Sequence, residues 1–213
     1  MTEVYVSVQG ESTWAGLPCV FIRLTGCNLR CTWCDSEFTF TGGEYRSIDD
    51  VLEEVAALGI PLVEVTGGEP LAHHQAIPLM QRLIDAGHTV LLETSGSLPI
   101  ASVPEGVHII MDLKPPDSGE VEANRMENID DLKATDEVKF VLASRRPACA
   151  HKSQRNTYAY RIRATPSRIL VSTCPPPSSA PQSSPRTPPL RSSGSAASCP
   201  TACRDWAAGP AAG

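Results

Sequence analysis

The sequence has no long hydrophobic run and no excess of positive charge. Its apolar stretches are strand-sized and fall short of the roughly 18 consecutive apolar residues that a membrane-spanning helix requires. The N-terminal Met1-Thr2-Glu3 lacks the basic flank and the apolar region of a secretory signal. The formal net charge of −6 argues against a general nucleic-acid binder, because such proteins are usually basic. These absences predict a cytoplasmic protein that binds neither a membrane nor nucleic acid.

Acidic and apolar side chains are scarce near the C-terminus. Residues 147–213 carry 1 acidic and 8 basic side chains, net +7, whereas residues 1–146 carry 23 acidic and 10 basic side chains, net −13. The same segment holds 11 of the 19 prolines and only five Val, Ile, Leu or Phe residues. It cannot bury enough apolar surface to offset the entropy of ordering it. We therefore predict an ordered domain over 1–146 and a Pro/Ser/Ala/Arg-rich, disordered tail over 147–213.

Residues 1–146 alternate between strand and helix patterns. A helix is predicted over 48–58, because Ser47 offers an N-cap, apolar residues recur on one face, and Gly59 follows as a stop. A second helix over 77–84 ends before Gly87. The predicted strands are 20–24, 61–66, 89–93, 108–113 and 137–142. Strands separated by helix-length segments predict βαβ units and a parallel sheet, an α/β fold.

Polar and glycine-rich loops follow four of these strands. They begin at Gly26-Cys27, Thr66-Gly67-Gly68-Glu69-Pro70, Glu93-Thr94-Ser95-Gly96 and Asp112-Leu113-Lys114-Pro115-Pro116. Functional residues of parallel sheets collect at the carboxyl ends of the strands, so these loops indicate a shared site. The alternative is that each loop only connects its neighbours, since Gly and Pro are common in any such connection.

Three cysteines, Cys27, Cys31 and Cys34, form a C-x3-C-x2-C pattern. Three thiols cannot pair evenly, and disulfides are rare in cytosolic proteins. Zinc usually takes four ligands in two separated pairs, whereas three thiolates on one loop suit an iron–sulfur cluster with one open iron. Zinc and inert thiols remain alternatives. Cys19 precedes a strand and is expected in the core as a small apolar residue.

The cysteine loop resembles the signature of the radical S-adenosylmethionine (SAM) superfamily, including an aromatic residue, Trp33, before the third cysteine. The segment 66–70 resembles the GGEP motif of that superfamily. Within it, the chain resembles the 7-carboxy-7-deazaguanine synthase family at 7–12, 16–29, 34–36 and 112–115, and the resemblance covers about residues 4–145. It implies a partial (β/α) barrel of the radical SAM type, incomplete after the fifth strand.

The resemblance also implies a reaction and its cofactors. Cys27, Cys31 and Cys34 would hold a [4Fe–4S] cluster whose fourth iron binds SAM, and reductive cleavage of SAM would yield a 5′-deoxyadenosyl radical. The implied enzyme is a lyase of deazapurine and queuosine biosynthesis. It converts 6-carboxy-5,6,7,8-tetrahydropterin to 7-carboxy-7-deazaguanine with loss of ammonia. A flavodoxin- or ferredoxin-type electron donor and a second copy of the chain, as a homodimer, are the implied partners.

The motifs of the family map onto this chain residue by residue. The residues implied to contact SAM are Trp33, Asp35, Gly68, Asp112, Leu113 and Lys114, with Glu93 and Ser95 as further candidates. The residues implied to contact the substrate are Val8, Gln9, Gly10, Arg23 and Thr66. Ser36 matches a position whose hydroxyl binds Mg²⁺, and Glu69 could receive a cationic amino group. From residue types alone, Ser36 could equally be a loop cap, and Asp112 and Lys114 a solvated ion pair.

Two other functions and two origins of the tail stay open. A glycyl-radical-enzyme activase shares the cysteine spacing, but Gln9-Gly10-Glu11 and Arg23 fit a small carboxylated pterin better. A non-catalytic metal- or cluster-binding protein would have no use for the Gly-Gly-Glu-Pro loop. The tail is either a genuine basic extension or the product of a reading-frame change near codon 146. We favour the reading-frame change, because the tail stands where the family has a further strand–helix unit.

Overall fold

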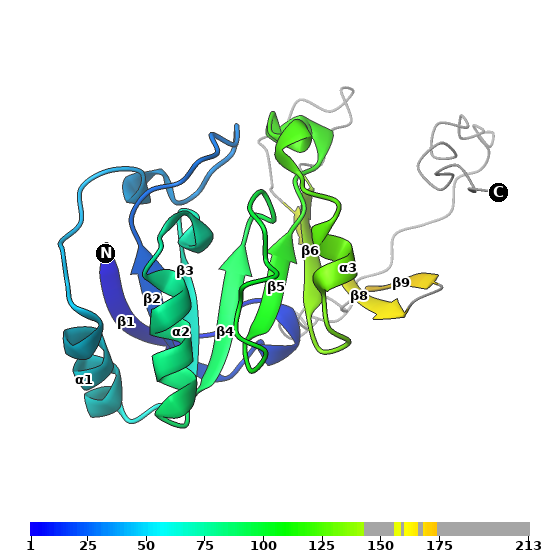
Figure 1. The fold of residues 1–213 in the computed structure, drawn as a ribbon. Coiled ribbons are helices and arrows are strands. Elements are labelled where there is room, and N and C mark those ends of the chain that lie inside the picture. The colour runs from blue at the N-terminus through cyan, green and yellow to red at the C-terminus, as the bar shows by residue number, and fades with distance from the viewer. Residues whose placement is uncertain (143–155, 159, 166–167, 174–213) are drawn as a thin grey trace, which may run out of the picture. The chain divides into compact units, whose positions relative to one another are not determined.

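The computed structural model describes residues 1–142, 156–158, 160–165 and 168–173, and Figure 1 shows their elements. The first six strands are β1 (Glu3–Val8), β2 (Pro18–Leu24), β3 (Leu62–Gly67), β4 (Thr89–Thr94), β5 (His108–Asp112) and β6 (Glu137–Leu142). They lie in one sheet in the order of the sequence. Strands β2 to β6 run parallel to one another, and β1 pairs antiparallel with β2 at the edge. Among the residues that the structure describes, the sheet does not close, so the predicted partial barrel is confirmed.

The five predicted strands are all present, whereas β1 was not predicted as a strand. Its residues alternate between branched and polar side chains, but the strand lies at an edge and buries neither face fully. Val6 is 45% exposed and Val8 is 59% exposed. The alternation is present in the sequence, but it marks no fully buried face, and the sequence analysis did not use it to predict a strand.

The helices are α1 (Ile48–Leu58), α2 (Ala76–Asp85) and the short α3 (Asn128–Asp131). Ser47 Oγ accepts a hydrogen bond from Asp50 N at 3.1 Å, and Ser47 N donates to Asp50 Oδ2 at 3.3 Å, which forms a capping box. Gly59 ends α1 with a left-handed φ of +66°. Single-turn 3₁₀ helices occur at Ser12–Trp14, Glu37–Thr39, Pro70–Ala72, Pro116–Ser118 and Val121–Ala123. Both predicted long helices are therefore confirmed.

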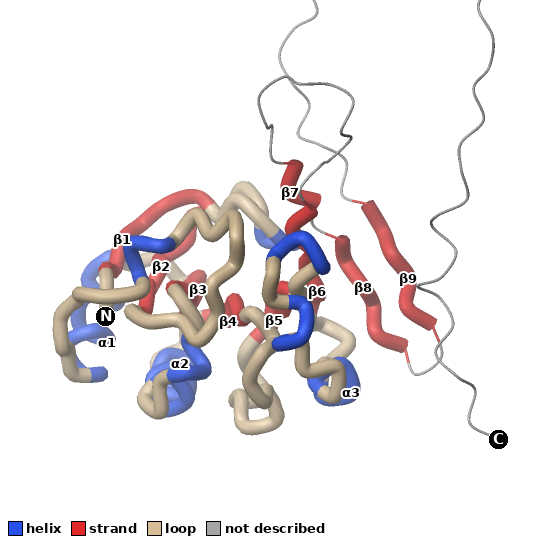
Figure 2. Tube along the Cα trace, turned by 90° about the horizontal axis from the view of Figure 1, so that it is seen from above, coloured by secondary structure: helices blue, strands red, loops and turns tan. Residues whose placement is uncertain are grey.

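The two faces of the sheet differ in chemistry because side chains alternate along each strand. Helices α1, α2 and α3 lie on one side of the sheet (Figure 2), and this side holds the main hydrophobic core. Its fully buried residues include Val20, Val65 and Leu92 from the strands and Val55 and Leu83 from the helices. Burial of each such side chain contributes about 1.5–3 kcal/mol.

The opposite face is apolar at the start of the strands and polar at their ends. Its smaller apolar cluster consists of Cys19, Phe21, Leu62, Leu91 and Ile110, with Tyr5 and Trp14 packed against it. At the positions that alternate with the core, and closer to the carboxyl ends of the strands, lie Arg23, Glu64, Thr66, Glu93, Asp112 and Lys139. The polar half of this face is where the predicted site should form.

The loop at residues 9–17 extends across this second face from β2 to β6. Trp14 packs edge-on against His108 of β5, with 5.2 Å between ring centroids. Thr13 N donates to both carboxylate oxygens of Glu137 on β6 at 3.2 Å, and Glu11 forms an ion pair with Lys139. The loop therefore connects the two sides of the open sheet, a role that further strands would fill in a closed barrel.

Three strands fall within the predicted tail: β7 (Asn156–Tyr158), β8 (Tyr160–Thr165) and β9 (Arg168–Thr173). β7 pairs antiparallel with β6, and β8 with β9. The sequence pattern did not predict them. The predicted boundary at residue 146 and most of the predicted disordered tail fall in 143–155 and 174–213, outside the described residues. Among the helices that the structure does describe, none has the length and apolarity needed to cross a membrane.

Candidate active site

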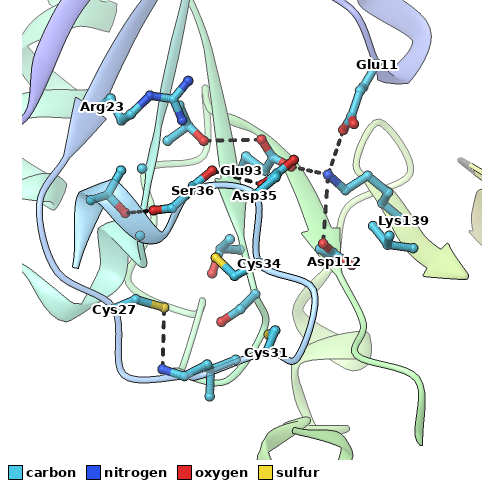
Figure 3. Close-up of a pocket in the computed structure, with 18 of the residues that line it drawn as sticks. Glu11, Arg23, Cys27, Cys31, Cys34, Asp35, Ser36, Glu93, Asp112 and Lys139 are labelled. Carbon is cyan, nitrogen blue, oxygen red and sulfur yellow. Dashed lines mark hydrogen bonds and ion pairs between the residues drawn. The ribbon is translucent and has the colours of Figure 1, made fainter. Parts of the chain in front are cut away.

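A cavity of about 360 Å³ lies over the polar half of the second face, at the carboxyl ends of the parallel strands. Figure 3 shows how side chains from the cysteine loop and from several strands face one another there. The sequence-predicted residues that line it are Gln9, Gly10, Arg23, Cys27, Cys31, Trp33, Cys34, Asp35, Ser36, Thr66, Gly68, Glu93, Ser95, Asp112 and Lys114. The structure thus brings together residues that are more than 100 positions apart in the chain.

Two of the predicted contact residues do not line this cavity. Val8 is exposed at the end of the edge strand β1. Leu113 is buried in the main hydrophobic core, because it follows Asp112 and its side chain points to the opposite side of the chain. Any contact of these two residues with a ligand in the cavity would have to involve their backbone atoms.

The cysteine loop is held in place by its own side chains and by the loop after β5. Arg30 Nη1 donates to the carbonyl oxygens of Cys27 and Leu29 at 2.8 and 2.6 Å, and its guanidinium carbon lies 4.2 Å from the centroid of the Phe40 ring. Thr32 N and Thr32 Oγ1 donate to the carbonyl oxygens of Ser118 and Asp117, both at 2.9 Å. The three thiols are therefore presented by a loop with a defined conformation.

The thiols fit an iron–sulfur cluster better than a single metal ion. Cys27, Cys31 and Cys34 are free, half-buried and line the cavity, whereas Cys19 is fully buried in the sheet. Within the described part of the chain, no three His, Cys, Asp or Glu side chains converge closely enough to hold one metal ion. Thiolates that each bind a different iron need not converge on one point, and soft sulfur ligands suit iron–sulfur chemistry.

The thiol pKa values also distinguish the cysteines. Burial raises the pKa of Cys27 and of Cys31, and burial together with the nearby Glu64 raises the pKa of Cys19 to about 12. Because metal ligation requires the thiolate, bound iron has to displace the protons of Cys27 and Cys31. Cys19 has no access to the cavity and behaves as a buried apolar residue, as predicted.

Gly68 lies where the loop after β3 touches the cysteine loop. A Cβ added at Gly68 would lie 2.0 Å from the carbonyl oxygen of Gly26 and 2.9 Å from Cys27 Cβ. The next amide, Glu69 N, donates to the same Gly26 oxygen at 2.9 Å. The missing side chain therefore allows two backbone segments to approach each other closely, in addition to any approach of a ligand.

Gly68→Ala should consequently lower the free energy of unfolding of the apo-protein by about 1–3 kcal/mol, because the added methyl group must displace backbone atoms. Gly10→Ala is the matched control, since no atom lies within 4 Å of a Cβ added there. It should change the unfolding free energy by less than about 1 kcal/mol. Urea unfolding of both variants measures the difference, and equal losses would contradict the assigned contact.

Glu69 has no direct access to the cavity in this structure. Its side chain is fully buried, and its two oxygens accept four hydrogen bonds, from Leu71 N, Thr94 Oγ1, Ser95 N and Ser95 Oγ, at 2.5–2.9 Å. The sequence suggested that Glu69 receives a cationic amino group. In the structure its carboxylate joins the loop after β3 to the end of β4, and the contact with an amino group stays a prediction.

Glu69→Gln should lower the unfolding free energy by about 2–3 kcal/mol, because the amide NH₂ then faces donors where the carboxylate accepted hydrogen bonds. Glu53→Gln is the control, since Glu53 is exposed on α1, and it should change stability by about 0.5 kcal/mol or less. Denaturant unfolding of the two apo-variants provides the comparison. A Glu69→Gln protein as stable as the parent would show that these hydrogen bonds contribute little.

Lys139 on β6 lies at the centre of a cluster of charged side chains, and Figure 3 shows its ammonium group among three carboxylates. Lys139 Nζ pairs with Glu11 Oε2 at 2.6 Å and with Glu93 Oε1, and lies 3.8 Å from Asp112 Oδ2. Lys114 Nζ pairs with the same Asp112 oxygen at 2.9 Å. The other oxygen, Asp112 Oδ1, is buried without a hydrogen bond, so it is available to a donor on a ligand.

The cluster controls the charge of Glu93. Burial by itself would raise the pKa of Glu93, but the charge and hydrogen bond of Lys139 outweigh burial and, with Lys114 and Thr66, hold this pKa well below its ordinary value. Burial likewise disfavours the charge on Lys139, yet Glu93, Asp112 and Glu11 raise the pKa of Lys139 well above its ordinary value. Both groups are therefore charged at neutral pH.

Arg23 lies on β2 with its guanidinium beside the cavity. Arg23 Nε pairs with Glu3 Oε1 at 2.9 Å, and Arg23 Nη2 donates to Tyr5 Oη at 2.6 Å. The Phe38 ring centroid lies 5.6 Å from the guanidinium carbon. The sequence suggested that an anionic ligand supplies the partner this arginine needs, whereas the structure supplies Glu3 for that purpose. The remaining guanidinium donors are available to a ligand.

Fold and cysteine loop together define a protein of the radical SAM class, and residues 21–117 match the family model of the radical SAM superfamily. A 7-carboxy-7-deazaguanine synthase from Koribacter versatilis is 52% identical over 147 residues, which cover 68% of this chain and 65% of that protein. The synthase from Thermoplasma acidophilum is 36% identical over 144 residues, which cover 67% of this chain and 69% of that protein. The chain belongs to the 7-carboxy-7-deazaguanine synthase family.

A solved structure supports the fold. The crystal structure of QueE from Escherichia coli matches with a TM-score of 0.57 and 24% sequence identity, over 67% of this chain and 71% of that chain. The chain spans 65% and 58% of the length of the relatives from Koribacter versatilis and Chlorobaculum tepidum. The matching segment of this chain therefore corresponds to only part of each relative.

Sequence reasoning missed two charged residues of the cavity, Glu64 and Lys139, and it named Glu11 only as part of the segment Gln9-Gly10-Glu11. Glu64 is the one charged residue of β3, as Arg23 is of β2, whereas β6 carries Lys139 together with Glu137 at its start. A charged residue that is buried within a strand needs a polar partner. A charged residue at an alternate position of an apolar strand was therefore the signal that could have identified them.

Proposed function

We propose that this chain is a radical SAM lyase that converts 6-carboxy-5,6,7,8-tetrahydropterin to 7-carboxy-7-deazaguanine with loss of ammonia. The observation that supports it most is the single cavity shared by Cys27, Cys31 and Cys34, by the backbone at Gly68, and by the polar groups of the second sheet face. When bound, a [4Fe–4S] cluster with SAM would supply a radical that abstracts hydrogen. The chain itself must hold these groups and orient the substrate.

The residues of the cavity divide into two groups for this function. We assign the cluster to the three cysteines, and SAM to the adjacent Trp33, Asp35, Gly68, Asp112 and Lys114. Lys114 and the unpaired oxygen of Asp112 can receive an anionic and a cationic group of a ligand, respectively. Arg23 and Thr66 lie toward the carboxyl ends of β2 and β3, and Gln9 and Gly10 begin the loop that crosses the second face; these four residues are assigned to the substrate. Arg23 would bind the carboxylate of the substrate.

Several further features belong to the same proposal. Ser36 Oγ donates to Asp35 Oδ1 at 3.0 Å, and its oxygen is available to Mg²⁺, a hard cation that prefers oxygen ligands. We also propose a cytoplasmic homodimer reduced by a flavodoxin- or ferredoxin-type donor. The resemblance to the family motivates these features, and each can be tested separately from the chemistry of the cavity.

Anaerobic reconstitution of the full chain tests the proposal. We expect about four iron and four sulfide per chain, and 5′-deoxyadenosine when the reduced protein receives SAM. With 6-carboxytetrahydropterin and Mg²⁺ added, 7-carboxy-7-deazaguanine should accumulate. Release of 5′-deoxyadenosine without this product would reject the substrate assignment but keep the radical SAM assignment. A reconstituted protein without SAM cleavage would reject both and leave the cysteines as a structural metal site.

A further inference from the structure

Glu64 is a buried acidic residue that the proposed function leaves without a role. It lies in the middle of β3, with Phe21 of β2 and Leu91 of β4 beside it in the register of the sheet. Its side chain is only 3% exposed, yet it lines the same cavity as the cysteines. Since Phe21 and Leu91 belong to the apolar cluster, Glu64 marks the border between the apolar and polar halves of this face.

The partners of Glu64 differ from those of the other carboxylates in the cavity. Glu11, Glu93 and Asp112 all contact Lys139, whereas no cation pairs with Glu64 among the described residues. The one hydrogen bond to its side chain there comes from Gln9 Nε2, which donates to Glu64 Oε2. Gln9 Oε1 accepts from Glu11 N at 3.1 Å, which fixes the orientation of the amide. Glu64 Oε1 has no hydrogen-bond partner in the described chain.

A carboxyl group in this position is neutral at physiological pH. Burial, followed by repulsion from Glu93, raises the pKa of Glu64 to about 9. Because the folded pKa lies above pH 7, the group keeps its proton in the folded protein. A carboxylic acid carries an O–H donor and a C=O acceptor side by side, whereas a carboxylate only accepts hydrogen bonds. Since Gln9 Nε2 already donates to Oε2, the proton belongs on the other oxygen.

We propose that Glu64 is a specificity-determining residue, whose carboxylic acid pairs with the adjacent donor and acceptor atoms on the edge of a flat nitrogen heterocycle. An amino-oxo-pyrimidine ring has such an edge, because its amidine ring nitrogen, an acceptor, lies next to the exocyclic amino group, a donor. Phe21, 8% exposed and also lining the cavity, offers an apolar surface beside that edge. This inference rests on the proposed function and identifies the part of the pterin that Glu64 recognises.

Equilibrium binding to the reconstituted chain with SAM tests this role, with 6-carboxypterin as the probe. The second probe, 6-carboxylumazine, replaces the 2-amino group by an oxo group and so changes the donor pattern of the edge. The wild-type chain should prefer the pterin at least about tenfold. Glu64→Met, which keeps the approximate shape, should weaken pterin binding at least about 30-fold and bring the preference close to one. Glu64→Gln retains a donor and an acceptor and should keep the affinity within about tenfold.

The outcomes separate the possible roles of Glu64. Wild-type-like binding by Glu64→Met would show that Glu64 only supports Gln9, and an equal loss in Glu64→Gln would show that an ionised carboxylate is required. Either result overturns the inference. A wild-type chain without preference between the two heterocycles overturns it whether or not the variants fold. A wild-type chain that cleaves SAM but binds no pterin overturns the substrate assignment together with this inference.

Discussion

Cys31→Ser should reduce the iron content from about four to less than about one per chain and lower SAM cleavage at least about 1,000-fold. Cys31 is one of three free thiols that line the cavity, and an oxygen ligand is a poor substitute for a thiolate on iron. With two thiolates left, the cluster loses one of the three attachments that keep it on the loop. Iron and sulfide analysis after anaerobic reconstitution, with chromatography of 5′-deoxyadenosine, measures both effects.

Cys19→Ala is the matched control for this prediction. Cys19 is fully buried between strands, outside the cavity, and its thiol does not contact the cysteine loop. Its removal should lower the unfolding free energy by roughly 1 kcal/mol through a small cavity, and leave the iron content unchanged. A Cys31→Ser protein that retained four iron atoms, or a Cys19→Ala protein that lost them, would contradict the assignment of the cluster to the loop.

Lys139→Met should lower the unfolding free energy of the apo-protein by about 2–4 kcal/mol at pH 7, because it leaves three carboxylates without their shared cation. Lys139 is buried, and it joins Glu11 of the loop at 9–17 to Glu93 and Asp112 on the sheet. The loss of unfolding free energy should stay below the largest losses known for broken buried ion pairs, because Glu11 and Glu93 keep contact with water in the cavity. Urea unfolding provides the measurement.

The effect of Lys139→Met should depend on pH in a defined direction. In the parent, the pKa of Glu93 is lowered on folding, so its stabilisation is present above the unfolded pKa near 4.5 and is lost as the pH falls through the folded value. Without Lys139, burial raises the pKa of Glu93, so the folded variant gains stability as the pH falls and this group takes up a proton. The difference between parent and variant should therefore be smaller at pH 5 than at pH 7.

Arg82→Met is the control for both measurements. Arg82 and Asp49 form an ion pair at 2.9 Å on the surface, with side chains 52% and 80% exposed. Its loss should lower the unfolding free energy by about 1 kcal/mol or less, with little dependence on pH between 5 and 7. If Lys139→Met destabilised the protein no more than Arg82→Met, the carboxylate cluster would not need its buried cation.

Much of the parallel sheet could be predicted because its signals are local. Each of β2 to β5 is a short run of apolar and branched residues that ends at a glycine or polar loop, and α1 has its cap and its stop in adjacent residues. The edge strand β1 was missed because it buries no face, and β7 to β9 because they lie in a segment poor in apolar residues. Pairing with a neighbouring strand, which no short segment shows, accounts for these elements.

The site could be predicted where a motif carries its chemistry in adjacent residues. The spacing of Cys27, Cys31 and Cys34 is already that of ligands on one loop. The glycines at 67–68 allow a close approach of the backbone simply because they have no side chain. Glu69 shows the limit of this reasoning. A glutamate next to a cofactor loop suggests a ligand contact, but the fold buries it and surrounds it with four donors from two strand ends.

The positions of β2 to β6 along the chain, the cysteine loop and the family resemblance can all be recognised in short segments. Their signals depend on residues that lie close together in the chain. The charges of the cavity follow only from the folded chain. Lys139 meets Glu11 across 128 residues, and Gln9 meets Glu64 across 55 residues. The charge of Lys139 keeps Glu93 ionised, whereas burial and repulsion from Glu93 keep Glu64 neutral despite the hydrogen bond from Gln9. Both glutamates nevertheless lie on the same face of neighbouring strands. Burial and the nearest cation set the pKa, and both depend on the packing of the sheet and its crossing loop.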